Sequence, residues 1–252
     1  VSGTLTIENG NIVGNVSAVQ VQTGHLYIKG GTFSLLQKWE NKSTYLINMI
    51  DAAYQDGSAR ATITGGTFVD YEPSQSTSEH PNANFVPTGY NVTQDGDSYV
   101  VTVKSDNVAE IGDIQYATLA DAVAAADNNT VTLLKDVTAD ITIPAGKTIT
   151  LDLNGKKLTA ATGCAIANKG NLTVVGAGTV QANGSDSAAI GNFPDAEVTL
   201  KGGNYLSKSW YVLKNLGTMT IDGEVTVKPS DSGNVSSLID NGWYGNASND
   251  MN

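Results

Sequence analysis

The side chains most able to do chemistry in this sequence are carboxylates at the ends of short apolar stretches. Asp152, Asp222 and Glu224 are examples. Two carboxylates on opposite sides of a glycosidic bond can hydrolyse it, one acting as the acid and the other as the base. The sequence contains no Asp–Asp pair, and no spacing favours one combination of acids over another. We therefore predict no catalytic residue among them.

Basic and metal-binding side chains are sparse as well. The chain has two histidines and one arginine, and His25, His80 and Arg60 stand in no catalytic motif. Asp95-Gly96-Asp97 offers oxygen atoms of the kind that calcium prefers, but the remaining ligands of a calcium-binding loop do not follow. Asp-Gly between two alternating stretches predicts a hairpin turn instead. We predict no metal site and no cofactor.

Aromatic residues in polar surroundings are the remaining candidates for a ligand site. The candidates are Trp39, Trp210, Tyr211, Trp243 and Tyr244, all in or beside predicted loops. Sugar rings stack on such aromatic faces, so these residues are our candidate glycan-binding positions. The preferred interpretation is nonetheless structural, with the rings packed over the flank of the fold. Stacking on glycans is the alternative to be tested.

The elements that must position these side chains are short strands that recur along the chain. Thr, Val, Ile and Leu alternate in each stretch, and most stretches run into a glycine. The period of two and the β-branched residues predict strands, and glycine permits the sharp corner that follows. The closing glycines Gly176, Gly202 and Gly223 are 26 and 21 residues apart (202 − 176 and 223 − 202), with no helix between them. This spacing predicts the stacked coils of a parallel β-solenoid.

A longer period is superimposed on the coils. Residues 22–30 align without gaps on residues 215–223, an offset of 193 (215 − 22). At the same offset Leu5–Ile7 falls on Val198–Leu200. The chain is therefore predicted to contain the end of one unit of this length and most of the next. Because it starts inside a predicted coil and stops at Asn252, where the counterpart of Ala61–Phe68 should come, we interpret it as a fragment of a tandem array.

We predict two domains. Residues 1–104 form the C-terminal part of a first β-helix unit with a closing hairpin, and residues 105–252 form the N-terminal part of a second unit. Three prolines in residues 71–88 mark the point where stacking ends in the first unit. Alternating residues on both sides of Gln94–Ser98 predict the hairpin. The apolar excursion Ser34–Ala59 is too long for a tight turn.

One helix is predicted, over Tyr116–Asp127. Thr118 precedes its first turn and Asp121 stands three residues later, which is the pattern of an N-cap. A short amphipathic helix of this kind can cover the first coil of a solenoid and shield its core. In the first unit, Thr44–Ile50 is predicted as a strand within the long excursion.

The amino-acid composition narrows the possible fold classes and partners further. The chain has 252 residues, 27 glycines, 15% charged residues and a net charge of −11. Low charge and abundant glycine favour turn-rich all-β structure, and the acidic balance argues against nucleic acid as a partner. The single cysteine, Cys164, permits no internal disulfide, and we expect it to be buried and inert. No apolar stretch is long enough to span a bilayer, so we predict no membrane insertion.

Several stretches together resemble a known domain type. Ile114–Val123, Thr130–Val137 and Lys147–Gly155 are similar to the start of right-handed parallel β-helix domains of the pectate-lyase-like fold. Such domains occur in large surface and adhesin-like proteins of bacteria and in some phage proteins. Gly65–Phe68 and the hairpin beginning Gly89–Val92 resemble the end of the same domain type. The resemblance implies an all-β, right-handed parallel β-helix, in two tandem partial units with a short N-terminal capping helix on the second.

This resemblance implies a fold more than a function, because β-helices carry enzymes, adhesins and inert stalks. Pectate lyases of this fold use a basic residue, usually Arg, with acidic calcium ligands, and Arg60 has no acidic cluster beside it in sequence. We expect a non-enzymatic extracellular repeat module, a stalk or adhesin segment of a bacterial surface protein or phage particle. Its expected partners are host or environmental glycans or other surface proteins. The alternative is a polysaccharide-processing β-helix, that is, a lyase, a hydrolase or a phage tailspike-like depolymerase.

Overall fold

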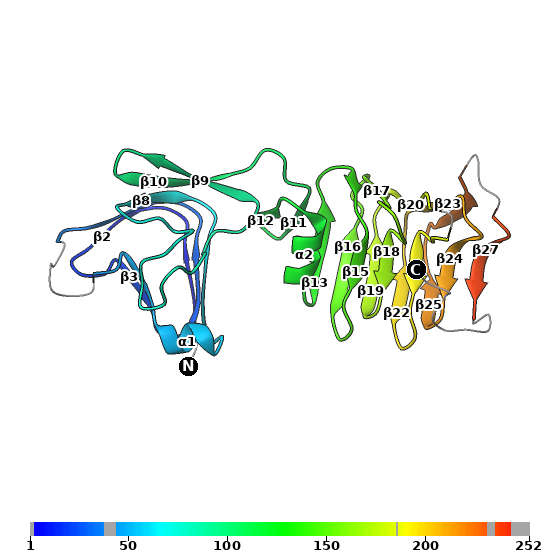
Figure 1. Cartoon of the computed structure of the whole chain (residues 1–252), viewed down its shortest axis with the longest axis horizontal. Helices are drawn as coiled ribbons and strands as arrows, with labels where there is room; N and C mark the ends of the chain where they lie inside the picture. Colours follow the sequence, from blue (N-terminus) through cyan, green and yellow to red (C-terminus); the bar gives the residue numbers. More distant parts are fainter. Residues whose placement is uncertain (1–2, 38–43, 185, 231–234, 243–252) are drawn as a thin grey trace. The chain divides into compact units, whose positions relative to one another are not determined.

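The computed structural model describes residues 3–37, 44–184, 186–230 and 235–242. The chain divides into two compact units, Val1–Ser105 and Asp106–Asn252. Strands dominate both units, and the described residues include two short helices, α1 (Asp51–Gln55) and α2 (Leu119–Ala125) (Figure 1). Because strands of successive coils pair in parallel in both units, the prediction of an all-β parallel β-helix is confirmed.

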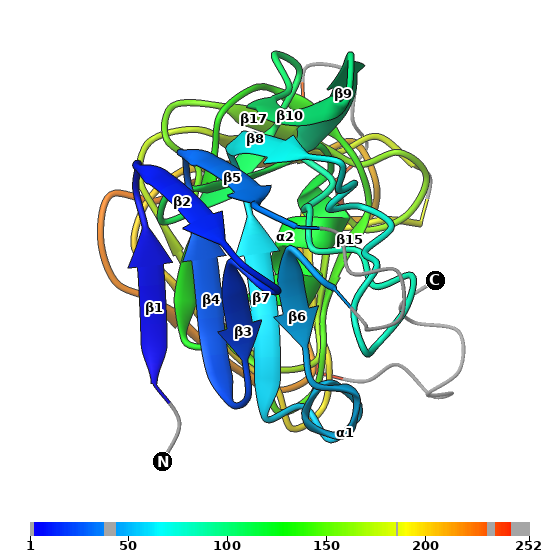
Figure 2. The same ribbon diagram turned by 90° about the vertical axis from the view of Figure 1, so that its left-hand side faces the viewer.

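Unit 1 is built from three sheets that collect strands of successive coils (Figure 2). Sheet 1A contains β1 (Thr4–Ile7), β4 (Gly24–Ile28) and β7 (Ala59–Ile63). Sheet 1B contains β2 (Asn11–Gly14), β5 (Thr32–Leu35), β8 (Gly66–Val69), β10 (Ser98–Val103) and β9 (Tyr90–Asp95). Sheet 1C contains β3 (Val19–Val21) and β6 (Ile47–Met49). The strands of the coils pair in parallel, whereas the hairpin β9–β10 joins β8 antiparallel.

The hairpin and the proline-rich segment end the stack in unit 1. The predicted hairpin is present, and Tyr99 of β10 pairs with Phe68 of β8. The backbone N–H of Ile63 donates to the carbonyl of Phe85 at 2.8 Å, so the proline-rich segment bonds to β7 where a further coil would otherwise bond. Within the long excursion β6 replaces the longer predicted strand Thr44–Ile50, and α1, which was not predicted, follows it.

Unit 2 also has three sheets that collect strands of successive coils, of seven, five and five strands (Figure 1). Sheet 2A contains β12 (Ile114–Tyr116), β11 (Ala109–Ile111), β13 (Asn129–Leu133), β16 (Thr148–Asp152), β19 (Asn171–Val175), β22 (Glu197–Leu200) and β25 (Thr218–Ile221). Sheet 2B contains β14 (Val137–Thr138), β17 (Lys157–Thr159), β20 (Thr179–Ala182), β23 (Asn204–Ser207) and β26 (Thr226–Pro229). Sheet 2C contains β15 (Ile141–Ile143), β18 (Ile166–Asn168), β21 (Ile190–Asn192), β24 (Tyr211–Asn215) and β27 (Ser237–Asn241).

The helix that opens unit 2 is shorter than predicted. Thr118 is the N-cap, and its hydroxyl accepts from the backbone N–H of Asp121 at 3.1 Å, as the sequence pattern indicated. Ile114–Tyr116 pairs with β11 as β12, which removes Tyr116, the first residue of the predicted span Tyr116–Asp127, from the helix. At the other end Ala126 is extended, which ends α2. Leu119, Ala122 and Val123 are buried against the first coil, so α2 does cover the core.

Each coil of unit 2 places alternate side chains in a single apolar core. Ile149, Leu172 and Val198 occupy the same register position on β16, β19 and β22, and all three are buried. On each strand, the residues that alternate with these buried positions point outward. The strand sequences therefore alternate between Thr and aliphatic residues. Parallel stacking thus turns a sequence period of two into a continuous apolar column.

A row of asparagines runs along sheet 2C beside this core. Asn168 donates from Nδ2 to Oδ1 of Asn192 at 2.8 Å, Asn192 donates likewise to Asn215 at 2.8 Å, and Asn215 donates to Asn241 at 2.6 Å. Asn168 also donates to the carbonyl of Glu197, and Asn192 to the carbonyl of Thr218. We call these four residues the asparagine ladder. It joins neighbouring coils through side chains as well as through backbone.

Asn192→Ala removes a buried link of the asparagine ladder. We expect a loss of roughly 2–4 kcal/mol of unfolding free energy, because Oδ1 of Asn215 loses its donor from Asn192, Nδ2 of Asn168 loses its acceptor, and the carbonyls of Ala196 and Thr218 each lose one hydrogen bond. Chemical denaturation measures this difference. Asn183→Ala is the matched control, since Asn183 is exposed, and a comparable loss in that variant would show that the ladder is not the cause.

Acidic side chains also fasten one coil to the next. The carboxylate of Asp140 accepts from the backbone N–H groups of Ala161, Thr162 and Gly163 and from the Thr162 hydroxyl, at 2.7–3.1 Å. Burial opposes ionisation of Asp140 and is the largest single influence, but the four hydrogen bonds together outweigh it and lower the pKa. The folded state therefore favours the ionised form of the Asp140 carboxylate.

Asp140→Asn tests this attachment through its pH dependence. Because the folded pKa is lowered, the ionised carboxylate stabilises the fold above the unfolded pKa of about 3.9, and this stabilisation disappears as pH falls through the folded value. We expect the variant to melt below the wild type at pH 7 and the two midpoints to converge in strong acid. Asp186→Asn, which changes another exposed acid of unit 2, should leave the midpoint unchanged at both pH values.

Candidate functional site

Unit 1 gathers basic, aromatic and hydroxyl side chains on the outer face of sheet 1A. Leu26 and Ile28 of β4 are buried, so the residues between them point outward. The strand register places these outward residues in two rows across β1, β4 and β7. The rows are Thr4, His25 and Arg60, followed by Thr6, Tyr27 and Thr62. We call these six residues the sheet 1A face.

His25 is held at the centre of this face. Its ring stacks on that of Tyr27 with centroids 4.0 Å apart and planes 13° apart, and its Nε2 lies 2.8 Å from Oγ1 of Thr62. Partial burial lowers the pKa of His25, and the nearby charge of Arg60 lowers it further. The imidazole is therefore neutral at pH 7 and offers one hydrogen-bond donor and one acceptor.

Arg60 is held in place by two backbone carbonyls and an aromatic ring. Its Nη1 donates to the carbonyls of Tyr54 at 2.7 Å and Ala59 at 2.8 Å, and its guanidinium carbon lies 5.1 Å from the centre of the Tyr54 ring. The Tyr54 ring in turn stacks on His80, whose Nδ1 is 2.6 Å from Oδ1 of Asp51. Carbonyl acceptors and an aromatic face both stabilise a charged guanidinium, so Arg60 suits anion binding better than proton abstraction.

A hollow of about 410 Å³ adjoins these two residues. Its lining residues are Gly3, Thr4, Gly24, His25, Gly57, Ser58 and Arg60. Gly24 has φ +90°, and a Cβ atom there would collide with the backbone of Gly3, so strand pairing itself requires glycine at that position. The hollow thus combines a fixed cation, an imidazole and hydroxyl groups, which can bind the hydroxyl and carboxylate groups of a sugar.

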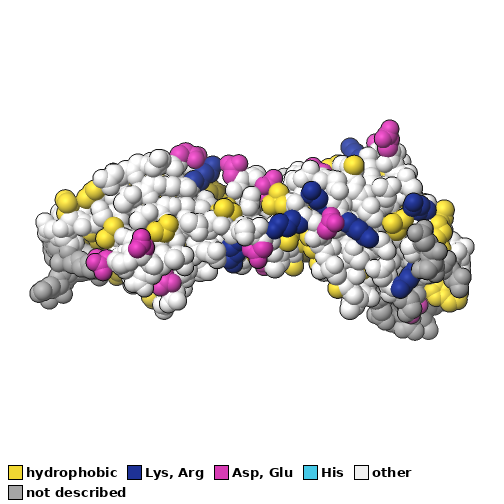
Figure 3. All heavy atoms as spheres, turned by 90° about the horizontal axis from the view of Figure 1, so that it is seen from above, with side chains coloured by type: hydrophobic (Ala, Val, Ile, Leu, Met, Phe, Trp, Pro, Cys, Tyr) yellow, Lys and Arg dark blue, Asp and Glu magenta, His cyan; other side chains and the backbone are white. Residues whose placement is uncertain are grey.

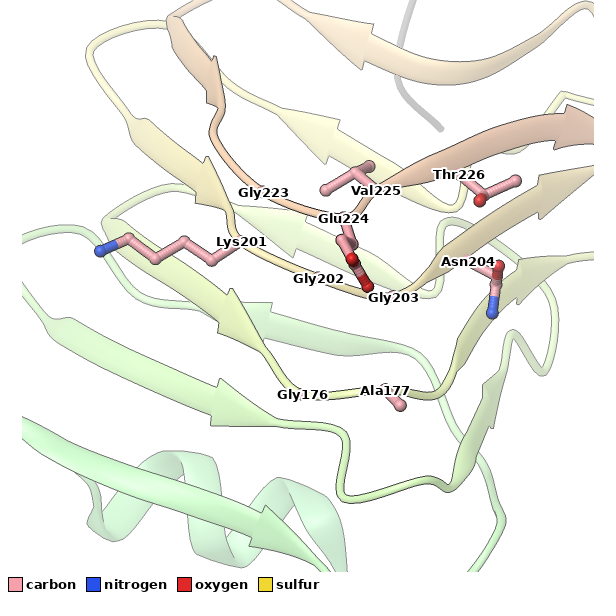
Figure 4. Close-up of a pocket in the computed structure, with 10 residues that line it drawn as sticks. All are labelled: Gly176, Ala177, Lys201, Gly202, Gly203, Asn204, Gly223, Glu224, Val225 and Thr226. Carbon is pink, nitrogen blue, oxygen red and sulfur yellow. The ribbon is translucent and has the colours of Figure 1, made fainter.

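Unit 2 carries a second hollow of about 590 Å³, where the corners of three successive coils lie one above another (Figure 4). The corners are Gly176–Ala177, Gly202–Gly203 and Gly223–Glu224. Figure 4 shows the Glu224 side chain directed toward the corner at Gly203, whereas Lys201 extends away from the hollow. The floor is mostly backbone, so few side chains are available there to select a ligand.

The glycines of this hollow are required by coil stacking. A Cβ atom on Gly202 would come within 2.8 Å of the Gly176 carbonyl oxygen, and one on Gly223 would collide with the carbonyl of Lys201. Gly176 and Gly223 also have φ values of +78° and +145°, which other residues rarely adopt. The glycines that recur in the sequence are therefore explained by structure, and the hollow follows from their lack of side chains.

The predicted aromatic residues lie in neither hollow as far as the structure describes them. Trp210, at the corner between β23 and β24, is 63% exposed, and its carbonyl accepts from Ser236 and Ser237. Tyr211 is partly buried, with Nζ of Lys214 5.5 Å from the centre of its ring. The remaining candidates, Trp39, Trp243 and Tyr244, lie outside the described residues. The glycan-binding hypothesis for all five residues stays a prediction.

The candidate acids serve local structure where hydrogen bonds are seen. Asp152 accepts from the backbone N–H of Asn154 at 2.9 Å, and Asp95-Gly96-Asp97 forms the turn between β9 and β10. Within the described ranges, no three His, Cys, Asp or Glu side chains lie close enough together to hold a metal ion. Figure 3 shows acidic and basic side chains interspersed on the face that it presents. Burial raises the pKa of the Cys164 thiol, which disfavours a reactive thiolate.

Comparison with known proteins gives no relative for this chain. No protein-family model matches it, and neither the search of curated proteins nor the search of solved structures found a match. The resemblance to pectate-lyase-like surface proteins therefore stays a prediction from sequence motifs, while the parallel β-solenoid is observed directly. None of the described helices has the length and apolar character needed to cross a membrane.

Trp210→Ala and Tyr211→Ala separate a surface role from a packing role for adjacent aromatics. We expect Trp210→Ala to change unfolding free energy by less than about 0.5 kcal/mol, because the side chain is exposed. Tyr211→Ala should cost more, because its ring is partly buried against the coil. Denaturant titration compares the two, and a large loss in Trp210→Ala would instead identify that ring as a packing residue.

Proposed function

We propose that the chain is a non-enzymatic extracellular repeat module, a stalk or adhesin segment of a large bacterial surface protein or phage particle. The observation that carries this proposal is the recurrence of whole coils at the offset of 193 residues. β1 and β2 coincide at both ends with β22 and β23 when their numbers are shifted by that offset. Repetition of a coil stack adds length to a protein without adding new chemistry, as a stalk requires.

The mechanical side of the proposal is supported by the continuity of bonding between coils. In unit 2 the parallel backbone ladders run through three sheets, and the asparagine ladder adds side-chain bonds along the same direction. Each coil is held by its neighbours on both sides, so pulling one coil away breaks several hydrogen bonds at once. Such a stack resists local unfolding and, with it, cleavage by proteases.

Contact with glycans is supported by the two kinds of surface described above. The sheet 1A face offers a fixed guanidinium, a neutral imidazole and hydroxyl groups beside a hollow. Trp210 offers an exposed aromatic ring in unit 2. We propose that host or environmental glycans bind through the sheet 1A face, with Trp210 as a separate contact.

A second candidate function, polysaccharide processing, is favoured by His25 and Arg60 lining the same hollow. A lyase needs a base to take a proton from the sugar, and the neutral His25 has the appropriate protonation state. The acids on which hydrolysis depends do not join these residues in the hollow. The stalk or adhesin is therefore the better supported of the two functions.

One experiment distinguishes these functions. The purified chain is incubated with a panel of host and plant polysaccharides, and both retention and polysaccharide length are followed. We expect retention of a carboxylated polysaccharide with no change of length, and at least a tenfold weaker retention by Arg60→Gln, which removes the cation. Asn183→Ala, at an exposed residue that lines neither hollow, is the control. Shortened polysaccharide would overturn the non-enzymatic proposal, and equal retention by Arg60→Gln would remove the sheet 1A face as the binding surface.

A further inference from the structure

His25 lies within sheet 1A, because β4 pairs with β1 on one side and with β7 on the other (Figure 2). The register of β4 with β7 places His25 beside Arg60. Neighbouring strands are about 4.8 Å apart, and both side chains line the hollow of about 410 Å³. One acidic group of a ligand in this hollow can therefore contact both His25 and Arg60.

Part of the Arg60 guanidinium is available to bind such a group. Both hydrogens of Nη1 are used, by the carbonyls of Tyr54 and Ala59. Among the described residues no acceptor is bonded to Nη2, which lies beside Gly57, where an added Cβ atom would be 3.0 Å from it. Because Gly57 lines the hollow, Nη2 can donate to a carboxylate bound there.

The His25 ring gains a further donor when it is protonated. Its Nε2 lies 2.8 Å from Oγ1 of Thr62, and within the described ranges no partner is bonded to Nδ1. A neutral imidazole carries one N–H group, whereas the protonated ring carries one on each nitrogen. Protonation therefore lets Nε2 keep its bond to Thr62 while Nδ1 donates to a ligand, and it adds a positive charge beside Arg60.

Two acids of the segment before β7 have lowered pKa values. Hydrogen bonds from the side chain and backbone of Ser58, together with the charge of Arg60, lower the pKa of Asp56. Hydrogen bonds, of which that from His80 has the largest effect, lower the pKa of Asp51. Both carboxylates therefore stay ionised between pH 8 and pH 5.

Other charged groups of unit 1 near this face are paired. Glu8, beyond the end of β1, is 3.2 Å from Lys29, beyond the end of β4. His80, the other histidine of the chain, has its Nδ1 2.6 Å from Asp51. Of the residues that line the hollow, His25 is therefore the one whose charge changes in mild acid.

We propose that the sheet 1A face binds acidic glycans more tightly in acid, with protonated His25 as a second cation beside Arg60. This inference rests on the proposed glycan-binding function and adds its regulation by pH. A carboxylate of the glycan accepts hydrogen bonds from Nη2 of Arg60 and from Nδ1 of protonated His25. Burial and the charge of Arg60 oppose protonation of His25 in the free protein, and the carboxylate offsets the second of these effects.

The pH range of the effect follows from the pKa of His25. Burial and Arg60 hold this pKa below the ordinary value of 6.5 in the free protein, and a bound carboxylate raises it. Affinity is therefore constant above the pKa of the complex, rises as the pH falls to the pKa of the free protein, and levels off below it. Glycan carboxyl groups, with ordinary pKa values of about 4, remain largely ionised at pH 5. A catalytic base would work in the neutral form, so acid would oppose catalysis while it strengthens binding.

Binding of an alginate oligosaccharide, a soluble polyuronate, tests this inference at pH 8 and pH 5. We expect the wild type to bind about tenfold more tightly at pH 5, as one added charge-assisted hydrogen bond allows. Calorimetry in buffers of different ionisation enthalpy should show proton uptake on binding near pH 6. The ring resonances of His25, followed by NMR in the wild type, should titrate at a higher pH in the complex than in the free protein.

His25→Gln keeps a side chain that can form hydrogen bonds but cannot gain a charge. Its affinity should stay close to the wild-type value at pH 8 over the whole range. His80→Gln is the matched control, since it removes the other histidine and should retain the tighter binding in acid. Circular dichroism melting checks that both variants fold.

Two results would overturn the inference and leave the proposed function standing. One is equal affinity of the wild type at pH 8 and pH 5, and the other is tighter binding in acid that persists in His25→Gln. Absence of binding at both pH values would instead overturn the proposed glycan binding at the sheet 1A face, and this inference with it.

Discussion

A buried side-chain amide needs partners for all its polar atoms, and the asparagines of unit 2 find these partners on neighbouring coils. Asn192 accepts from Asn168, donates to Asn215 and reaches the carbonyl of Thr218. Moving a coil by one residue would leave these groups unpaired inside the protein, at a cost of about 1–3 kcal/mol for each group. The ladder therefore fixes the register of the coils, and the apolar column beside it depends on that register.

Other features of unit 2 can be understood as means of keeping that register. Glycine at the corners lets one coil approach the backbone of the previous one, as Gly202 does above Gly176. Carboxylates such as Asp140 bind backbone N–H groups of the next coil and hold its corner in place. Asp152, one of the acids considered for catalysis, likewise accepts a backbone N–H, from Asn154. Side chains that could bind a ligand are found instead on surfaces such as the sheet 1A face, where they point away from the core.

Much of the fold was predictable because its signals are local. Alternation identified most strands, Asp-Gly identified the hairpin, and Thr118 identified the start of α2. Tyr116, the first residue of the predicted helix span, was assigned wrongly because Ile114–Tyr116 is drawn into a sheet by a strand partner, which local pattern does not reveal. The asparagine ladder was missed because its members are unevenly spaced and matter only once the coils are stacked. The sheet 1A face was missed for a similar reason, since His25 and Arg60 meet only through the pairing of β4 with β7.

The unequal lengths of the coils in unit 1 have a consequence for how such a protein can change. From Thr4 to its partner His25 the chain advances 21 residues (25 − 4), but from His25 to its partner Arg60 it advances 35 (60 − 25). The additional residues leave at a corner, and the strands on either side still pair in register. Because closing a longer loop costs little free energy, corners can gain or lose segments while the ladders remain intact. The fold thus separates a hydrogen-bonded scaffold of strands from peripheral loops, in which new recognition segments can be inserted without any redesign of the core.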